Sequence, residues 1–176
     1  MKIEMIIHYG SENTEEQLHN TLQSIKDKDN TPDKIRLCIN PPIARVPTYS
    51  EVVKKISNVF DTTIECYLQI LTYPRKRIQD VINDTVNLSN ADYYVFVNAG
   101  HLFEDNEIVN EIRNRAVIVS EGIDDNFNEF ACNVKLHKHL GGFGEHYSLI
   151  EKIEYKLKAL EEAKNNEKFA NSDQDT

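Results

Sequence analysis

The sequence predicts an α/β fold, a single domain with a mostly parallel central sheet flanked by helices. Short apolar runs with strand character alternate with segments whose apolar residues recur at helical spacing, in the order β-α-β-α-β-α-β. The strand-like runs also end in polar or glycine-containing loops. This alternation favours a doubly wound sheet with right-handed crossovers.

The first half of the chain begins with a strand at residues 3–7. A helix follows, for which Thr14 and Gln17 form a capping box. Its buried face carries apolar and small residues at helical spacing: Leu18, Thr21, Leu22 and Ile25. Residues 34–40 alternate like a second strand, which ends at two prolines because proline cannot continue a hydrogen-bonded ladder.

The middle of the chain repeats the pattern. A helix capped by Thr48 or Ser50 precedes a third strand at residues 62–71. An amphipathic helix begins at Ile78, after a basic loop, and the fourth strand spans residues 93–97.

The last part of the chain is predicted as a short helix at 107–113, strands at 116–120 and 130–136, and a charged helix at 149–163. We expect residues 1–164 to form one domain and the polar residues 165–176 to be a disordered tail.

Composition argues against several function classes, although the bulk charge does not exclude a nucleic-acid substrate. The chain has 176 residues and a net charge of −9, which disfavours nonspecific binding to nucleic acid or to an anionic membrane face. No signal peptide and no apolar run of about 20 residues is present, so a cytoplasmic protein is expected. The three cysteines lack metal or redox spacing, and Cys38 and Cys66 are expected to be buried thiols.

Two loops mark a candidate site. The fourth strand runs directly into Asn98-Ala99-Gly100-His101, and the glycine-rich stretch 141–145 follows much later. In an open α/β sheet, ligands bind beyond the carboxyl ends of the strands. No Gly-x-Gly-x-x-Gly follows the first strand, which argues against a plain Rossmann-type nucleotide-binding domain.

The chain resembles family 2 glycosyltransferases with the A-type fold over about residues 3–147. The resemblance rests on several stretches in order: Ile7-His8-Tyr9-Gly10, the helix pattern at 15–25, Tyr94-Val95-Phe96-Val97-Asn98-Ala99-Gly100, and Gly141-Gly142-Phe143-Gly144-Glu145. It implies a nucleotide-sugar donor and an acceptor hydroxyl. Compact members of this kind are familiar among tailed bacteriophages, so the resemblance points to a viral origin and to modified phage DNA or a glycan as acceptor.

The resemblance also implies roles for individual residues. Tyr9 would pack on the nucleobase, and Asn40 stands where an aspartate usually holds the uracil or ribose. Arg77 would contact the donor, and Gly142 belongs to the loop near the acceptor. A basic side chain before a helix suits phosphate in any case, since arginine binds it bidentately.

The residues that the family uses for catalysis and for metal binding are matched less completely in this sequence. Glu145 and Glu151 are the candidates for the base that deprotonates the acceptor. Asn98 and Gly100 replace the two aspartates that usually hold Mn²⁺ or Mg²⁺, although Glu104 and Asp105 follow closely.

Histidines offer further candidates. His101 is a candidate metal ligand or leaving-group stabiliser, and His139 a candidate diphosphate or acceptor contact. His137 and His139 are expected to point to opposite faces of a strand end, which makes them poor partners for one ion.

Two hypotheses follow. The first is a compact glycosyltransferase. The second is a catalytically inactive relative kept as a binding or assembly module, because both metal carboxylates are replaced and the chain is short. The oligomeric state is not predicted.

Overall fold

The computed structural model describes residues 1–10, 12–26, 31–40, 67–73, 76–103, 107–115, 129–144, 161–162 and 164–165. The predicted strand at 116–120, the helix after Thr48 or Ser50, and most of the predicted helix at 149–163 lie outside these residues. So does the predicted tail, apart from Asn165, which is helical.

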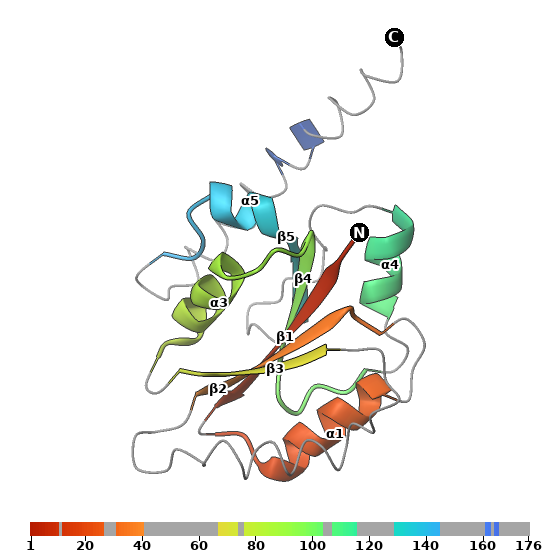
Figure 1. Ribbon diagram of the computed structural model, residues 1–176, viewed down its shortest axis with the longest axis vertical. Coiled ribbons are helices and arrows are strands. Elements are labelled where there is room, and N and C mark those ends of the chain that lie inside the picture. Colours follow the sequence, from red (N-terminus) through yellow and green to blue (C-terminus); the bar gives the residue numbers. More distant parts are fainter. Residues whose placement is uncertain are drawn as a thin grey trace.

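One five-stranded sheet, ordered β3-β2-β1-β4-β5, forms the centre of the described structure (Figure 1). The strands are β1 (Ile3–Gly10), β2 (Lys34–Asn40), β3 (Tyr67–Thr72), β4 (Tyr93–Asn98) and β5 (Glu129–Asn133). The first four are parallel, and β5 is antiparallel to β4. The predicted fold class, a mostly parallel sheet flanked by helices, is therefore confirmed.

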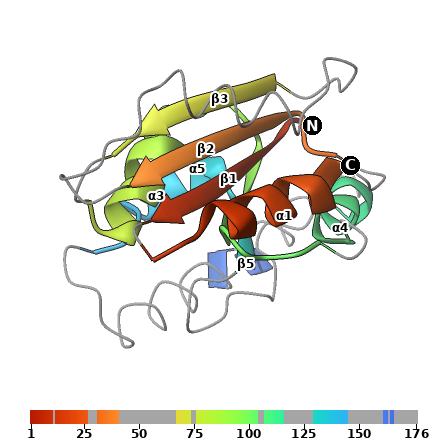
Figure 2. The ribbon, with the colours of Figure 1, turned by 90° about the horizontal axis from the view of Figure 1, so that it is seen from below.

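Helices cover both faces of the sheet (Figures 1 and 2). They are α1 (Glu15–Lys26), α3 (Ile78–Asn87), α4 (Glu107–Arg115) and α5 (Val134–His139). One apolar cluster joins α1 and α4 to one face of the sheet, and a second joins α3 and α5 to the other. We call these the α1 face and the α3 face. Because side chains alternate along a strand, each strand contributes to both clusters.

Helix α1 begins as its sequence predicts. The backbone amide of Thr14 donates to Gln17 Oε1 at 2.9 Å, and the Gln17 amide donates to Thr14 Oγ1 at 3.1 Å. This reciprocal pair satisfies amides that the first turn leaves unbonded. Leu18 and Leu22 are buried against the sheet, so the predicted capping box and apolar face are both confirmed.

The predicted strand at 130–136 is wrong in its second half. Strand β5 ends at Asn133, whose side-chain oxygen accepts a hydrogen bond from the amide of Leu136 at 3.0 Å. Asparagine is among the strongest helix N-caps, and here it starts α5 directly after the strand. His137 and His139 therefore lie on a helix, not on a strand end.

The amino ends of β1 and β2 carry a buried ion pair on the α3 face. Glu4 and Arg36 are 2% and 5% exposed, and the Arg36 guanidinium contacts the Glu4 carboxylate directly. The Ser89 hydroxyl donates to the other Glu4 oxygen. We call Glu4, Arg36 and Ser89 the amino-edge network; it fixes β1 and β2 to the turn that follows α3.

Cys38 is buried, and burial raises the pKa of its thiol to about 12. The predicted buried thiol is confirmed there, whereas Cys66 lies outside the described residues. Among the helices that the structure describes, none is long and apolar enough to cross a membrane.

Candidate functional site

The strand order reverses between β1 and β4, at the centre of the sheet. From β1 the chain passes to β2 and β3 on one side and then returns to β4 on the other. At such a switch point the connections leave in opposite directions, and a crevice forms outside the carboxyl ends of the strands. His8 of β1 and Asn98 of β4 are directly paired in register at this point.

Three side chains meet there in a hydrogen-bonded row, which we call the carboxyl-edge network: Asn40, His8 and Asn98. His8 Nδ1 lies 3.1 Å from Asn98 Oδ1, and His8 Nε2 lies 3.1 Å from Asn40 Nδ2. All three residues stand at alternate positions on the strands and so lie on the α3 face. The structure thus brings Asn40 and Asn98, both candidates from sequence, to one place.

The proton position on His8 follows from the orientation of Asn40. Asn40 Nδ2 donates to the carbonyl of Lys76 at 2.6 Å, and Asn40 Oδ1 accepts from the Lys76 amide at 3.1 Å. Those two backbone groups orient the amide so that its nitrogen faces His8. His8 Nε2 must then accept, and Nδ1 carries the proton that is donated to Asn98.

The imidazole of His8 is neutral. Burial lowers its pKa, while the hydrogen bond to Asn98 acts in the opposite direction. Protonation of Nε2 would also place two donors against each other, at His8 and Asn40. The carboxyl-edge network therefore carries no formal charge.

The loop after β4 is attached to helix α1. The amide of Gly100 donates to Thr21 Oγ1 at 2.8 Å, and the amide of Phe103 donates to Ser24 Oγ at 3.0 Å. Gly100 has φ +103°, a backbone conformation that side chains rarely adopt. His101 follows and packs its ring edge-on against Phe103 at 4.7 Å.

Asn13 closes the site on the α1 side. Its side-chain oxygen accepts from the amide of Gly10 at 2.9 Å, and its Nδ2 donates to the carbonyl of Ala99 at 3.0 Å. The ends of β1 and β4 are thereby bridged. Tyr9 packs against the apolar cluster of the α1 face and so lies across the sheet from the carboxyl-edge network.

The basic loop leads from β3 into α3 and is held by Asn40. Arg77 is the N-cap residue of α3, and its guanidinium binds both carboxylate oxygens of Asp80, with Nε 2.9 Å from Oδ2. Lys76 pairs with Asp84 and lies over the ring of Tyr73. Both ion pairs are exposed to solvent, with Arg77 48% exposed.

The glycine loop is built against the middle of α3, not against the strand ends. The backbone of Phe143 exchanges two hydrogen bonds with the Asn83 side chain, at 3.0 and 2.9 Å. A side chain at Gly142 would place its Cβ 2.4 Å from Asn83 Oδ1, so this close approach requires glycine. Gly142 therefore lies on the α3 side of the sheet, and no described contact joins it to Asn98 or to Tyr9, which lies on the α1 face.

His137 lies beneath this loop. Its Nδ1 is 2.8 Å from the Tyr94 hydroxyl and its Nε2 is 2.9 Å from Asn83 Oδ1. Burial lowers the pKa of His137 to about 4, with the nearby charge of Lys138 acting in the same direction. His139, by contrast, is 71% exposed at the end of α5 and lies 3.6 Å from Glu162.

Within the part of the chain that the structure describes, the residues do not fit a metal site of the expected kind. Asn98 is engaged by His8, and Gly100 has no side chain. No group of three metal-binding side chains occurs within the described ranges. Glu104, Asp105 and the two candidate bases, Glu145 and Glu151, lie outside these ranges.

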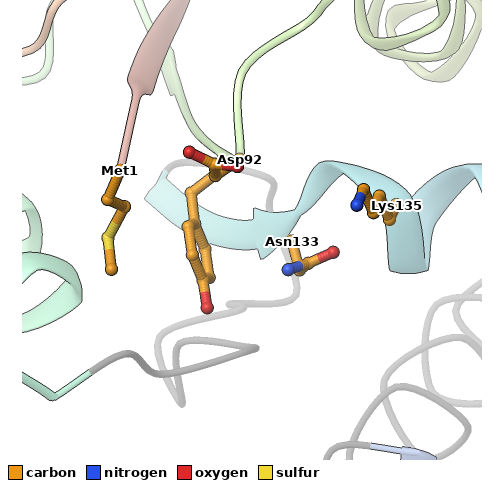
Figure 3. A pocket seen from close by; sticks show the side chains of 5 residues that line it. Met1, Asp92, Asn133 and Lys135 are labelled. Carbon is orange, nitrogen blue, oxygen red and sulfur yellow. The ribbon is translucent and has the colours of Figure 1, made fainter.

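A hollow of about 390 Å³ occurs at the opposite, amino edge of the sheet (Figure 3). It is lined by Met1, Asp92, Tyr93, Asn133 and Lys135. Asp92 accepts a hydrogen bond from the backbone amide of Lys2 at 2.7 Å. The hollow is separate from the strand-end site.

Sequence reasoning missed three residues of the site, His8, Asn13 and Thr21. Each is an ordinary polar residue in sequence, and only pairing across the sheet assigns it a partner. A usable signal existed for His8, because a polar residue at an inward position of a buried strand requires a hydrogen-bond partner.

Comparison with known proteins supports the fold. No protein-family model matches the chain, and no curated protein sequence does. Solved structures are similar at low identity. A mannosyltransferase, PcManGT from Pyrobaculum calidifontis in complex with GDP-Man and Mn²⁺, has a TM-score of 0.63 at 15% identity, over 86% of this chain and 50% of that one.

Two further solved structures have a similar fold. S. aureus TarS 1-349 gives a TM-score of 0.61 at 13% identity, over 90% of this chain and 55% of that one. The 4-diphosphocytidyl-2C-methyl-D-erythritol synthase of Anaerococcus prevotii gives 0.57 at 13% identity, over 88% and 83%. The chain spans about half the length of the mannosyltransferase and TarS structures. It therefore has the fold of A-type nucleotide-diphospho-sugar transferases.

Proposed function

We propose that this chain binds a nucleotide sugar at the carboxyl edge of its sheet and transfers the sugar to an acceptor hydroxyl. The observation that carries the proposal is the meeting of β1, β2 and β4 in the carboxyl-edge network, at the point where the strand order reverses. Ligands of open α/β sheets bind at that position.

The fold sharpens the choice of ligand. The similar structures contain GDP-Man in the mannosyltransferase and UDP-GlcNAc in TarS. Nucleoside diphosphates and their sugars are therefore the donors to test. The same comparison is the reason to prefer a transferase over a binding module without activity.

In this proposal, two parts of the donor bind on opposite faces of the sheet edge: the nucleobase on the α1 face and the diphosphate on the α3 face. Tyr9, partly buried on the α1 face, offers a ring for the nucleobase. Arg77, on the α3 side, offers an exposed guanidinium for the diphosphate. The carboxyl-edge network lies between them, and it bonds the end of β1, which carries Tyr9, to the loop that carries Arg77.

The acceptor stays a prediction from sequence, with a glycan and modified phage DNA as the two classes. In both classes an acceptor hydroxyl must lose its proton, and Glu145 and Glu151 are the proposed bases. Loss of transfer in Glu145→Gln or Glu151→Gln, with donor affinity unchanged, would identify the base.

The first experiment is calorimetry of the full chain with UDP, GDP, UDP-GlcNAc and GDP-mannose. The Tyr9→Leu variant keeps an apolar side chain but removes the stacking ring, so nucleotide affinity should fall about tenfold. Tyr93→Leu makes the same change at the opposite edge of the sheet and should leave affinity unchanged.

Three outcomes are informative. Binding that depends on Tyr9, followed by release of the nucleoside diphosphate with an acceptor, supports the transferase. Binding without turnover on any glycan or DNA acceptor would favour the inactive module. No binding to any of the four compounds would contradict the proposal.

A further inference from the structure

We infer that the donor diphosphate is held at this site without a divalent cation, and that Arg77 supplies positive charge in its place. This inference rests on the proposed function and concerns the same site. It follows from how the side chain at position 98 is bonded and from the backbone at position 100.

The side-chain oxygen of Asn98 is bonded to a neighbouring strand and is not left open to a ligand. Its side-chain oxygen accepts the proton of His8 Nδ1 at 3.1 Å, and His8 is bonded on its other side to Asn40. A hard divalent cation prefers several oxygen ligands, including carboxylates. The carboxyl-edge network instead offers one neutral amide oxygen that already has a donor.

Position 100 could not complete a metal site even if it carried a carboxylate. A Cβ built on Gly100 lies 3.5 Å from the side chain of Gln17 on α1, while Asn98 faces α3. The φ of +103° would also strain any side chain there. The turn after β4 therefore sends positions 98 and 100 to opposite faces of the sheet.

Arg77 is placed to meet an anion at this edge. Its loop is bound to the end of β2 by the two hydrogen bonds between Asn40 and Lys76. Its pair with Asp80 is exposed and so contributes little to stability, which leaves the guanidinium able to exchange Asp80 for a diphosphate.

Gln79, two residues later, carries an unsatisfied polar group in the first turn of the same helix. The residue is 2% exposed, and its side-chain nitrogen has no hydrogen-bond partner. A buried donor left unbonded is costly. A phosphate oxygen at the start of α3 would offer it a partner only after the side chain turned outward from its buried position.

The test is calorimetry of the full chain with UDP and GDP, once with EDTA and once with excess MnCl₂. We expect dissociation constants that agree within about threefold between the two conditions. Arg77→Gln should weaken binding about tenfold in EDTA, the amount that a charge-assisted hydrogen bond contributes. Arg113→Gln is the matched control, because Arg113 forms a similar exposed pair with Asp33 elsewhere on the molecule.

The possible results separate the two proposals. Binding that requires Mn²⁺, or that Mn²⁺ tightens more than about tenfold, would overturn this inference and leave the proposed function standing. An Arg77→Gln variant that binds like Arg113→Gln would also overturn it. No binding in either condition would overturn both.

Discussion

The two ends of β1 and β2 carry polar networks on the same face of the sheet, and these networks are opposite in kind. At the amino edge, Glu4 and Arg36 form a buried ion pair. At the carboxyl edge, His8 and Asn40 are neutral and bonded through an amide and an imidazole. Ile6 and Cys38 separate the two networks with apolar packing.

The difference indicates that the two ends of the strands have different roles. A buried charge requires its partner, since an unpaired charge in the interior costs several kcal/mol. The amino edge therefore stabilises the fold only while both charges are present. The carboxyl-edge network keeps its polar groups satisfied without formal charge, so the network itself presents no carboxylate to an anionic ligand.

The largest expected effect comes from breaking the amino edge. Arg36→Met should lower the free energy of unfolding by about 3–5 kcal/mol, because Glu4 is left buried without its main partner. Urea unfolding measures the loss. The double variant Glu4→Leu with Arg36→Met removes both charges and should recover at least half of it. A single variant as stable as the native chain would show that Lys34, 3.9 Å from Glu4, replaces the arginine.

The next largest effect is a loss of stability in acid, where the buried neutral histidines become protonated. The pKa of His137 is about 4 in the folded chain and near 6.5 when unfolded, so the unfolded state alone binds a proton between those values. Stability should be full above pH 6.5 and should fall by up to about 3 kcal/mol as the pH drops to 4. His137→Gln should flatten this dependence, leaving the smaller contribution of His8, whose lowered pKa acts in the same direction. An unchanged slope in His137→Gln would contradict the assignment.

A carboxylate introduced into the carboxyl-edge network would test whether the network depends on being uncharged. In Asn98→Asp the carboxylate faces His8 Nδ1 and should raise the pKa of His8, which histidine NMR resonances would report. Stability at pH 7 should change by only about 1 kcal/mol, because the new ion pair is offset by the conflict between a protonated His8 and Asn40. An unshifted His8 together with Mn²⁺ binding to the introduced carboxylate would show that the site accepts a metal after all.

The smallest effect is expected at Gln79, which belongs to neither network. Gln79→Met keeps the volume and removes the unbonded amide, so it should stabilise the free chain by about 1 kcal/mol. The same change should weaken nucleotide binding if Gln79 meets the ligand. Gln17→Met is the contrast, because it removes one half of the capping box and should cost about 1 kcal/mol. A destabilised Gln79→Met variant would mean that the buried amide already has a partner.

Local patterns in the sequence predicted most of the fold. Helical spacing and the Thr14 capping box located α1, and the two prolines marked the end of β2 at Asn40. The error at 130–136 arose because apolar residues continue past Asn133, so hydrophobicity could not show where the strand became a helix. The N-cap formed by the Asn133 side chain sets the point where the strand ends and the helix begins.

The candidate site was predictable only in part. A polar or glycine residue at the end of a strand is visible in sequence, which is why Asn98 and Gly100 were candidates, whereas Asn40 became one through the family resemblance. Gly142 was grouped with them by motif, but its loop packs on Asn83 of α3. Sequence order does not reveal how far from the strand ends a distant loop will pack, even when it covers the same face of the sheet.

The sequence by itself determined the alternation of strands and helices, because the spacing of apolar residues is a local property of the chain. The tertiary structure alone decided that His8 lies between Asn40 and Asn98, that its imidazole is neutral, and that positions 98 and 100 face opposite ways. Those features depend on strand register and on one backbone turn, and both arise from contacts between residues far apart in the chain.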